Sequence, residues 1–257
     1  MRLPLGLSWC FISVGVEILM ARSDADSILK QVVIRYKTFN SYQDEGSVET
    51  VPFPGQRPLE FKTVFSKPDR FCFQWRTWHP HVGAGNDPLE AKVWFDGTTC
   101  RSLHLEEEKE DSVSLCLAEG LGVSSGSIIM ILKLLLPLSL EMNKFWTEMK
   151  NARIQNEDIV DGAHCYHLVG DCESEEDTEA WIGKDSFVVH RLRAHMHISL
   201  EAVEETRRKA LELFKSLGMA ETSPAVIEAL SALPAQARSY YHQYNYRKVV
   251  IDGPVEI

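Results

Sequence analysis

The side chains best suited to chemistry gather in the second half of the chain, where cysteines and histidines recur within a short distance. They are Cys165, His167 and Cys172, with His164, His190, His195 and His197 on neighbouring stretches. Zinc sites use three or four such ligands in a tetrahedral array, with characteristic spacings along the chain. The spacing Cys-x-His-x4-Cys fits none of the standard patterns, so we interpret these residues as scattered over the faces of strands. A disulfide between Cys165 and Cys172 across a hairpin stays open as an alternative.

Three other short patterns fall short of the motifs that they partly match. Ser124-Ser125-Gly126-Ser127 lacks the Gly-x-Ser-x-Gly frame of a nucleophile elbow. Gly120-x-Gly122 lacks the remaining glycines and the βαβ context of a dinucleotide site. The acidic run from 106 to 111 lacks the glycine and spacing of a calcium loop. We therefore expect no catalytic residue, no metal and no cofactor, and keep a hydrolase or metal enzyme only as a third alternative.

The strongest pattern consists of bulky apolar side chains. They recur at alternate positions in strand-like stretches, and a short segment after residue 127 is apolar nearly all round. The residues are Phe61, Phe65, Phe71, Phe73, Trp75 and Trp94 on the strands, with Ile128, Ile131 and Leu135 on the helix. A curved sheet with such a concave face can hold an acyl chain, at roughly 0.8 kcal/mol per buried methylene. The alternative is that these side chains form an ordinary core, with the helix as its plug rather than as a lid.

The elements that would position these residues follow from periodicity and turn signals. Strand-like alternation recurs through the chain, and Asp96-Gly97 and Asp161-Gly162 are hairpin signals. We predict strands at 41–51, 59–66, 70–78, 90–95, 98–105, 152–159, 165–170, 178–182, 188–198 and 240–251. We predict helices at 24–39, in two pieces over 112–136, and in two pieces over 200–235, with a charged hairpin tip at 106–111. Hairpins imply antiparallel pairing, so the fold class is mainly β (α+β), with one curved sheet around helices.

The net charge argues against a nucleic-acid-binding protein, and the cysteine count argues against a protein held together by a full set of disulfides. The chain has 257 residues, a net charge of −10 and an isoelectric point near 5.4. Nucleic-acid binding needs phosphate-neutralising basic patches, so no nucleic-acid partner is expected. Of six cysteines, five lie beyond residue 25, and an odd number does not indicate a fully paired framework.

The first 25 residues resemble a targeting segment. Arg2 precedes a nearly continuous apolar run from Leu3 to Met20, and Ser23-Asp24-Ala25 offers small residues for cleavage. We expect a signal peptide at 1–25 and a single domain at 26–257, with a retained membrane anchor as the alternative. No later stretch is long enough to cross a bilayer, so we expect no stable transmembrane span in the mature chain. The expected location is periplasmic or otherwise extracytoplasmic.

Five phrases occur in an order that resembles a known family. They begin at Tyr42-Gln-Asp-Glu-Gly-Ser-Val, Phe61-Lys-Thr-Val-Phe-Ser-Lys-Pro-Asp-Arg-Phe, Val93-Trp-Phe-Asp-Gly, Asp161-Gly-Ala-His-Cys-Tyr-His-Leu and Ala180-Trp-Ile-Gly-Lys-Asp-Ser-Phe-Val-Val-His-Arg-Leu. Over residues 26–198 and 239–251 the chain resembles the outer-membrane lipoprotein-sorting-like proteins, the superfamily of periplasmic lipoprotein carriers. The resemblance implies a half-open β-barrel of about eleven antiparallel strands, with helices covering the concave face. It also implies that this face binds acyl chains.

The chain departs from the family pattern at three places. The helical insertion at 200–235 is unusual, Gly183 stands where an acidic residue is common, and the chain stops soon after Asp252-Gly253-Pro254. We therefore expect a lipid- or lipoprotein-binding protein rather than a defined carrier. The alternative is a module for protein–protein interaction or regulation in the cell envelope, which would bind envelope proteins through helices 200–235.

Overall fold

The computed structural model describes residues 24–51, 57–78, 88–104, 107–136, 145–173, 177–216 and 238–255, with several residues between 218 and 230 and Ile257. Its centre is one eleven-stranded antiparallel sheet in the order β6-β5-β4-β3-β2-β1-β11-β10-β9-β8-β7. The strands are β1 (Ser41–Val51), β2 (Leu59–Ser66), β3 (Arg70–Thr77), β4 (Leu89–Phe95), β5 (Cys100–His104), β6 (Glu107–Asp111), β7 (Lys150–Val160), β8 (Ala163–Asp171), β9 (Thr178–Gly183), β10 (Val189–Ile198) and β11 (Arg238–Ile251). The helices are α1 (Ala25–Thr38), α2 (Val113–Val123), α3 (Ser127–Leu135), the 3-10 turn η1 (Trp146–Glu148) and α4 (Leu200–Ser216).

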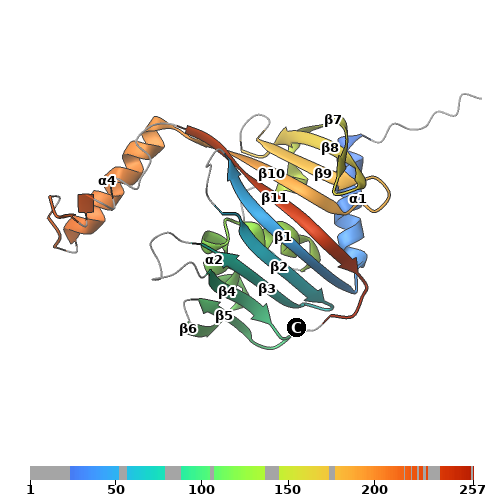
Figure 1. The fold of residues 1–257 in the computed structure, drawn as a ribbon, viewed down its shortest axis with the longest axis horizontal. Coiled ribbons are helices and arrows are strands. Elements are labelled where there is room, and N and C mark those ends of the chain that lie inside the picture. The colour runs from blue at the N-terminus through green and yellow to red at the C-terminus, as the bar shows by residue number, and fades with distance from the viewer. Residues whose placement is uncertain are drawn as a thin grey trace, which may run out of the picture.

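The sheet is open, because its outermost strands β6 and β7 pair only with their inner neighbours. Helices α1, α2 and α3 lie against one face, which we call the inner face; the opposite one is the outer face (Figure 1). The architecture expected from the sequence, a half-open antiparallel sheet with helices over one side, is confirmed.

Helix α1 begins where the sequence offers a capping residue. The side chain of Asp24 accepts a hydrogen bond from the backbone N–H of Ser27 at 2.6 Å, which satisfies one donor of the first turn. Ile28, Val32 and Tyr36 follow at helical spacing and are buried against the sheet and its neighbours. This stripe fixes α1 across the inner face.

Helices α2 and α3 are joined by a short link that is tied to the sheet. Ser125 and Gly126 both adopt positive φ values, and the hydroxyl of Ser127 donates to the carbonyl of Ser124 at 2.7 Å. The hydroxyl of Tyr244 on β11 donates to the carbonyl of Ser125 at 2.8 Å. The side chains of Ser124 and Ser127 are buried in the link.

Two predicted elements differ from the structure or fall largely outside it. The stretch 106–111 was expected as a charged tip, but Glu107–Asp111 forms strand β6, and all five of its residues are exposed. That expectation is wrong because backbone pairing with β5 holds an edge strand that needs no apolar face. Most of the second predicted helix within 200–235 lies outside the described residues, as does the predicted signal peptide up to residue 23; its last two residues, Asp24 and Ala25, cap and begin α1.

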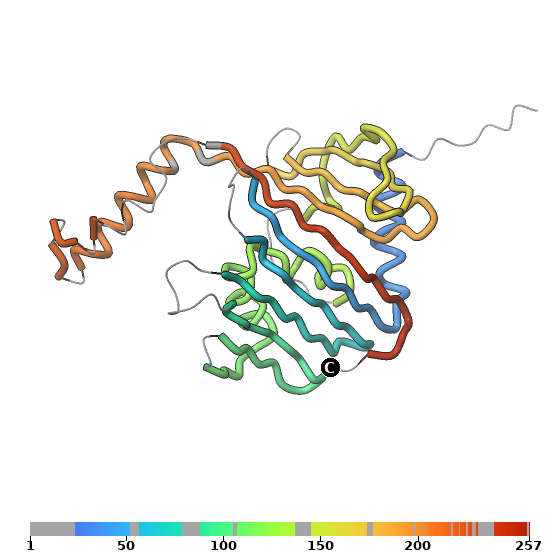
Figure 2. The backbone as a smooth tube through the Cα atoms, viewed as in Figure 1, coloured from blue at the N-terminus to red at the C-terminus, as the bar shows by residue number. Residues whose placement is uncertain are grey.

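Helix α4 confirms the first helix of the predicted insertion and projects away from the sheet. Strands β10 and β11 run on as a two-stranded ribbon, and α4 continues outward from its end (Figure 2). The ribbon is paired as far as Ile198 opposite Arg238. Among the described residues, no helix has the length and apolar character needed to cross a membrane.

Candidate functional site

The inner face carries rows of large apolar side chains across strands β2, β3 and β4. Strand register places Phe61 beside Trp75, and Phe65 beside Phe71. The rings of Phe61 and Phe73 stack with centroids 5.7 Å apart, and those of Phe73 and Trp75 lie 5.8 Å apart. All five side chains are at most 4% exposed. The alternation predicted from the sequence therefore gathers these five residues on one face.

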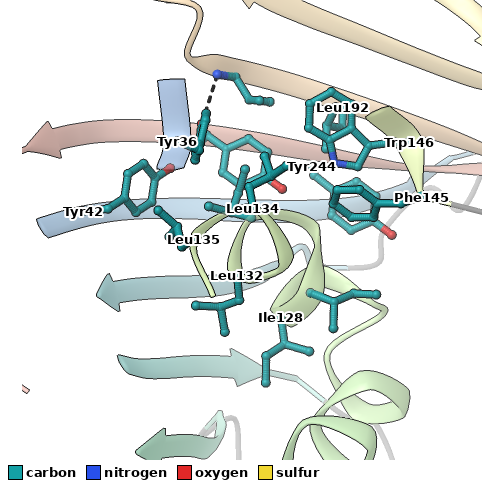
Figure 3. Close-up of a cluster of buried hydrophobic side chains, with 14 of the residues drawn as sticks. Tyr36, Tyr42, Ile128, Leu132, Leu134, Leu135, Phe145, Trp146, Leu192 and Tyr244 are labelled. Carbon is teal, nitrogen blue, oxygen red and sulfur yellow. Dashed lines mark hydrogen bonds between the residues drawn. The ribbon is translucent and has the colours of Figure 1, made fainter. Parts of the chain in front are cut away.

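Helix α3 fills the space in front of this face. Seven of its nine residues are buried, including Ile128, Ile131 and Leu135, which are 0%, 1% and 7% exposed. They belong to the same core cluster as the five strand residues, and α3 packs against β2 and α1. Figure 3 shows Ile128, Leu132 and Leu135 on α3 in front of the strands. In this conformation the protein's own side chains occupy the place expected for a hydrocarbon.

Trp94, the ninth residue expected at the site, lies on the opposite face. Val93 opposes Phe73 on the inner face, and Trp94 is its immediate neighbour, opposite Cys72 and Arg101. The Lys92 ammonium stacks over the Trp94 ring, 4.2 Å from its centroid. Because successive strand residues point to opposite faces, the expected placement of Trp94 with the inner rings needs correction.

A cavity of about 270 Å³ opens where α2 meets strands β4, β5 and β6. Trp75, Val93 and Gly120 belong to its lining, and they continue into the inner-face core. A Cβ on Gly120 would lie 2.8 Å from Cδ1 of Ile128 and 3.3 Å from Cγ2 of Val93, so glycine lets α2 approach the core closely. The exposed polar side chains of the lining are His104, Glu107, Lys109 and Glu119, which form a polar rim beside Val123, whereas Leu103 is half-buried and Ser102 is buried.

Of the residues that line the cavity, Trp75 was expected at the site from the sequence, whereas the others were not, although a signal for some of them was present. Val93 and Ser102 continue the inner row that Thr63 and Phe73 begin, so strand alternation alone could have identified them. Gly120 gives no comparable signal, because its role depends on how closely a helix approaches a sheet.

A larger hollow of about 660 Å³ lies on the outer face, over β1 to β5 and β11. Its lining is dominated by charged side chains, namely Glu45, Glu60, Lys62, Arg76, Glu90, Lys92, Arg247 and Lys248. Arg76 donates to Glu90 at 2.8 Å. A surface of paired charges is unsuited to hydrocarbon, so the smaller cavity by α2 is the better candidate for an apolar ligand.

A group of polar side chains is buried on the inner face next to α1. The carboxylate of Asp44 accepts hydrogen bonds from the Tyr42 hydroxyl at 2.8 Å and from the backbone N–H of Thr63 at 3.1 Å. Burial raises the pKa of Asp44 to about 6, although these two hydrogen bonds act to lower it. The Tyr246 hydroxyl is buried nearby and has no hydrogen-bond partner among the described residues.

The outer face of β8 to β11 holds His167 and His195, two of the histidines that the sequence suggested. The carboxylate of Glu179 contacts Nε2 of His167 at 2.7 Å and Nε2 of His195 at 2.8 Å, and accepts from Arg193 at 3.1 Å. Burial acts to raise the pKa of Glu179, but these hydrogen bonds and the charge of Arg193 outweigh it and hold the pKa at about 2. Across the described parts of the chain, no group of three or more histidine, cysteine or acidic side chains is placed to hold a metal ion.

The cysteines that were weighed as a hairpin disulfide are separated. Cys165 packs with Val160 and Trp181 in a small cluster, whereas Cys172 packs against the main core. The Cys172 thiol lies 3.8 Å from the carbonyl of Phe145. No disulfide links Cys165 to Cys172 in this structure.

No protein-family model matches the chain, and no curated protein matches it. Among solved structures, the fold aligns with LprF from Mycobacterium bovis over 91% of this chain and 95% of that one, with TM-score 0.41 and 10% identity. The alignment with lipoprotein LppX from Mycobacterium tuberculosis covers 90% of this chain and 97% of that one, with TM-score 0.43 and 10% identity. The alignment with a LolA superfamily protein from Nitrosomonas europaea covers 91% of this chain and 96% of that one, with TM-score 0.30 and 8% identity. The strand order and the helices on the inner face are themselves the architecture that the lipoprotein-sorting resemblance implied.

Proposed function

We propose that this protein binds the acyl chain of a lipid or lipoprotein between the inner face of its sheet and the α2–α3 pair, in an extracytoplasmic compartment and without catalysing a reaction. The observation that carries the proposal is the cavity beside Gly120, which leads from a polar rim to the ring of Trp75, a member of the core. A polar rim over an apolar floor suits a ligand with a headgroup and a hydrocarbon tail.

The cavity of about 270 Å³ is small for a whole acyl chain, since ligand pockets usually measure ~300–1,000 Å³. The remaining space would come from displacement of α3. Its side chains cover the aromatic rings in this structure, and a hydrocarbon that replaced Ile131 and Leu135 would cover the same rings. Each methylene buried there contributes ~0.8 kcal/mol, which offsets the contacts that α3 gives up.

The link between α2 and α3 supports this movement. Ser125 and Gly126 already have positive φ values, and the Tyr244 hydroxyl ties the carbonyl of Ser125 to the sheet with one hydrogen bond. Tyr244→Phe removes that bond and keeps the ring. We expect the variant to take up a fluorescent fatty-acid probe faster than the parent protein in stopped-flow measurements, because the link is released.

Native mass spectrometry of the full chain from an exporting host tests the proposed function. We expect protein masses raised by co-purifying lipid, and saturable binding of a fluorescent fatty acid to protein stripped of lipid. Protein that is consistently free of lipid, and that fails to bind the probe, would contradict the proposal.

A variant that fills the cavity tests the site. Ser102 is 6% exposed and lines the cavity, so Ser102→Phe places a ring inside it. If that ring excludes two methylenes of the ligand, the probe affinity falls about tenfold. The matched control is Arg101→Phe, which adds the same ring to the outer face one residue earlier. Equal probe affinity in both variants would show that the ligand binds at another place in the protein.

A second candidate function rests on the projecting helix. Helix α4 stands clear of the sheet, and its Leu200 and Leu213 side chains are more than half exposed. An exposed amphipathic helix favours docking to a protein in the envelope. Deleting the insertion separates the two functions, because lipid binding on the inner face does not involve α4.

A further inference from the structure

Two buried cysteines on neighbouring elements face each other beside the cavity. Cys100 begins β5 and is 2% exposed, whereas Cys116 lies in the first half of α2 and is fully buried. Each thiol lies close enough to the other to shift its pKa. Helix α2 packs against β5. Both side chains belong to the main core.

The other described cysteines lie elsewhere in the fold. Cys72 lies on the outer face opposite Trp94. Cys165 belongs to a small separate cluster, and Cys172 packs against the main core at the other end of the sheet. The spacing of cysteines in the sequence does not disclose this pair.

We propose that Cys100 and Cys116 form a disulfide that fastens α2 to β5 and so fixes one wall of the cavity. The role of that wall in ligand entry rests on the proposed function, whereas formation of the bond does not. The bond closes a loop that contains the whole of β6 and the Ser112 cap of α2. The edge strand and the helix would then be held to the sheet together.

The bond forms by thiol–disulfide exchange with a small disulfide such as oxidised glutathione. A Cys116 thiolate attacks one sulfur of the oxidant and releases one glutathione thiolate, which leaves a mixed disulfide. A Cys100 thiolate then attacks the Cys116 sulfur and releases the second glutathione. Two protein thiols thereby lose two protons and two electrons, and the oxidant becomes two glutathione thiols.

The burial of both groups determines when this exchange takes place. Burial raises the pKa of both thiols, and the hydrogen bond from Cys100 offsets part of that rise for Cys116, so Cys116 is the first nucleophile. In the folded protein few thiolates are present and the oxidant has no access. Exchange therefore occurs during folding or when α2 opens.

Peptide mapping of the full chain tests the bond. The protein is refolded with a mixture of reduced and oxidised glutathione, its free thiols are alkylated under denaturing conditions, and it is digested without reduction. We expect a linked pair of peptides containing Cys100 and Cys116, and the same pair in the control variant Cys72→Ala. Recovery of both peptides in alkylated form, or linked to other cysteines, would overturn the proposal.

Hydrogen exchange tests the fastening without any ligand. We expect backbone amides of α2 to exchange at least ~10-fold more slowly in the oxidised protein than in the reduced protein, with amides of β9 unchanged. The Cys116→Ala variant should exchange at the reduced rate under both conditions. Equal rates in α2 for the two redox states would overturn the fastening even if the bond forms. Neither result depends on probe binding, so failure of the proposed function would be seen separately.

Discussion

At the scale of single residues, the most unusual feature is a carboxyl group inside the apolar core. Asp44 is completely buried, and its neighbours include the rings of Tyr36, Tyr42 and Tyr246. Its pKa of about 6 lies above the ordinary value of 3.8. The folded state therefore binds this proton more tightly than the unfolded chain does, which links folding stability to pH.

Asp44→Asn is expected to flatten that dependence. The stabilising contribution of protonated Asp44 is complete below about pH 3.8 and is lost as the pH rises through about 6, a change of about 3 kcal/mol. Asparagine does not titrate, its Oδ1 can still accept from the Thr63 N–H, and its Nδ2 can donate to the oxygen of the Tyr42 hydroxyl. Urea unfolding at several pH values should therefore show the variant gaining on the parent as the pH rises. A constant difference across that range would show that Asp44 does not titrate as described.

Glu179 is expected to act in the opposite direction. Its pKa is about 2 in the folded protein against an ordinary 4.5, so its stabilising contribution is present above about pH 4.5 and is lost as the pH falls through about 2. Glu179→Gln should lower the free energy of unfolding by about 2 kcal/mol near neutral pH, with a smaller loss in acid. Thermal unfolding measures both. Glu157→Gln is the control, because its pair with Lys184 is exposed and should contribute little.

The residues show where prediction from sequence stopped. The alternation of apolar and polar residues correctly placed Phe61, Phe73 and Trp75 on one face, because alternate residues of a strand share a face and the apolar face is the buried one. Trp94 was placed on the wrong face because it was grouped with the other aromatic residues by its residue type. Its position next to Val93, which lies on the inner face, assigns it to the outer face. The burial of Asp44 and the contact between Cys100 and Cys116 depend on tertiary packing, which no local spacing encodes.

At the scale of elements, the insertion that carries α4 is separable from the sheet. Strands β10 and β11 remain paired up to Ile198 and Arg238, so the ends of the insertion are already adjacent. Replacing residues 199–237 by Asn-Gly should close a tight hairpin. We expect the shortened protein to keep its fold, measured by circular dichroism, and to lose less than about 1 kcal/mol in urea unfolding. Loss of cooperative unfolding would show that the insertion supports the sheet.

Most elements could be predicted because their signals are local. The turns Asp96-Gly97 and Asp161-Gly162 separate strands β4 from β5 and β7 from β8, and the serine and glycine residues before Ser127 separate α2 from α3. Strand β6 was missed because its five exposed, charged residues show no alternation. Its existence depends on hydrogen bonds to β5, which belong to the fold and not to the segment.

At the scale of the whole molecule, the proposed function requires that an acyl chain replace helix α3 as the apolar group that covers the inner face. If an acyl chain displaces α3, the amides of α3 should lose protection from hydrogen exchange when a fatty acid binds, while strands β1, β2 and β11 keep theirs. Hydrogen exchange with and without a fatty acid measures this. A ligand that instead raises the protection of α3 would indicate binding in the existing cavity alone.

The central strand pair has a consequence for how the chain is made. Strand β11 lies between β1 and β10 and joins a half built from β1–β6 to a half built from β7–β10. During synthesis both halves emerge before β11, so the edges of β1 and β10 that pair with β11 stay unpaired until it emerges. Such edges invite pairing with other chains. We therefore expect a nascent copy of this protein to depend most on a chaperone just before β11 is released.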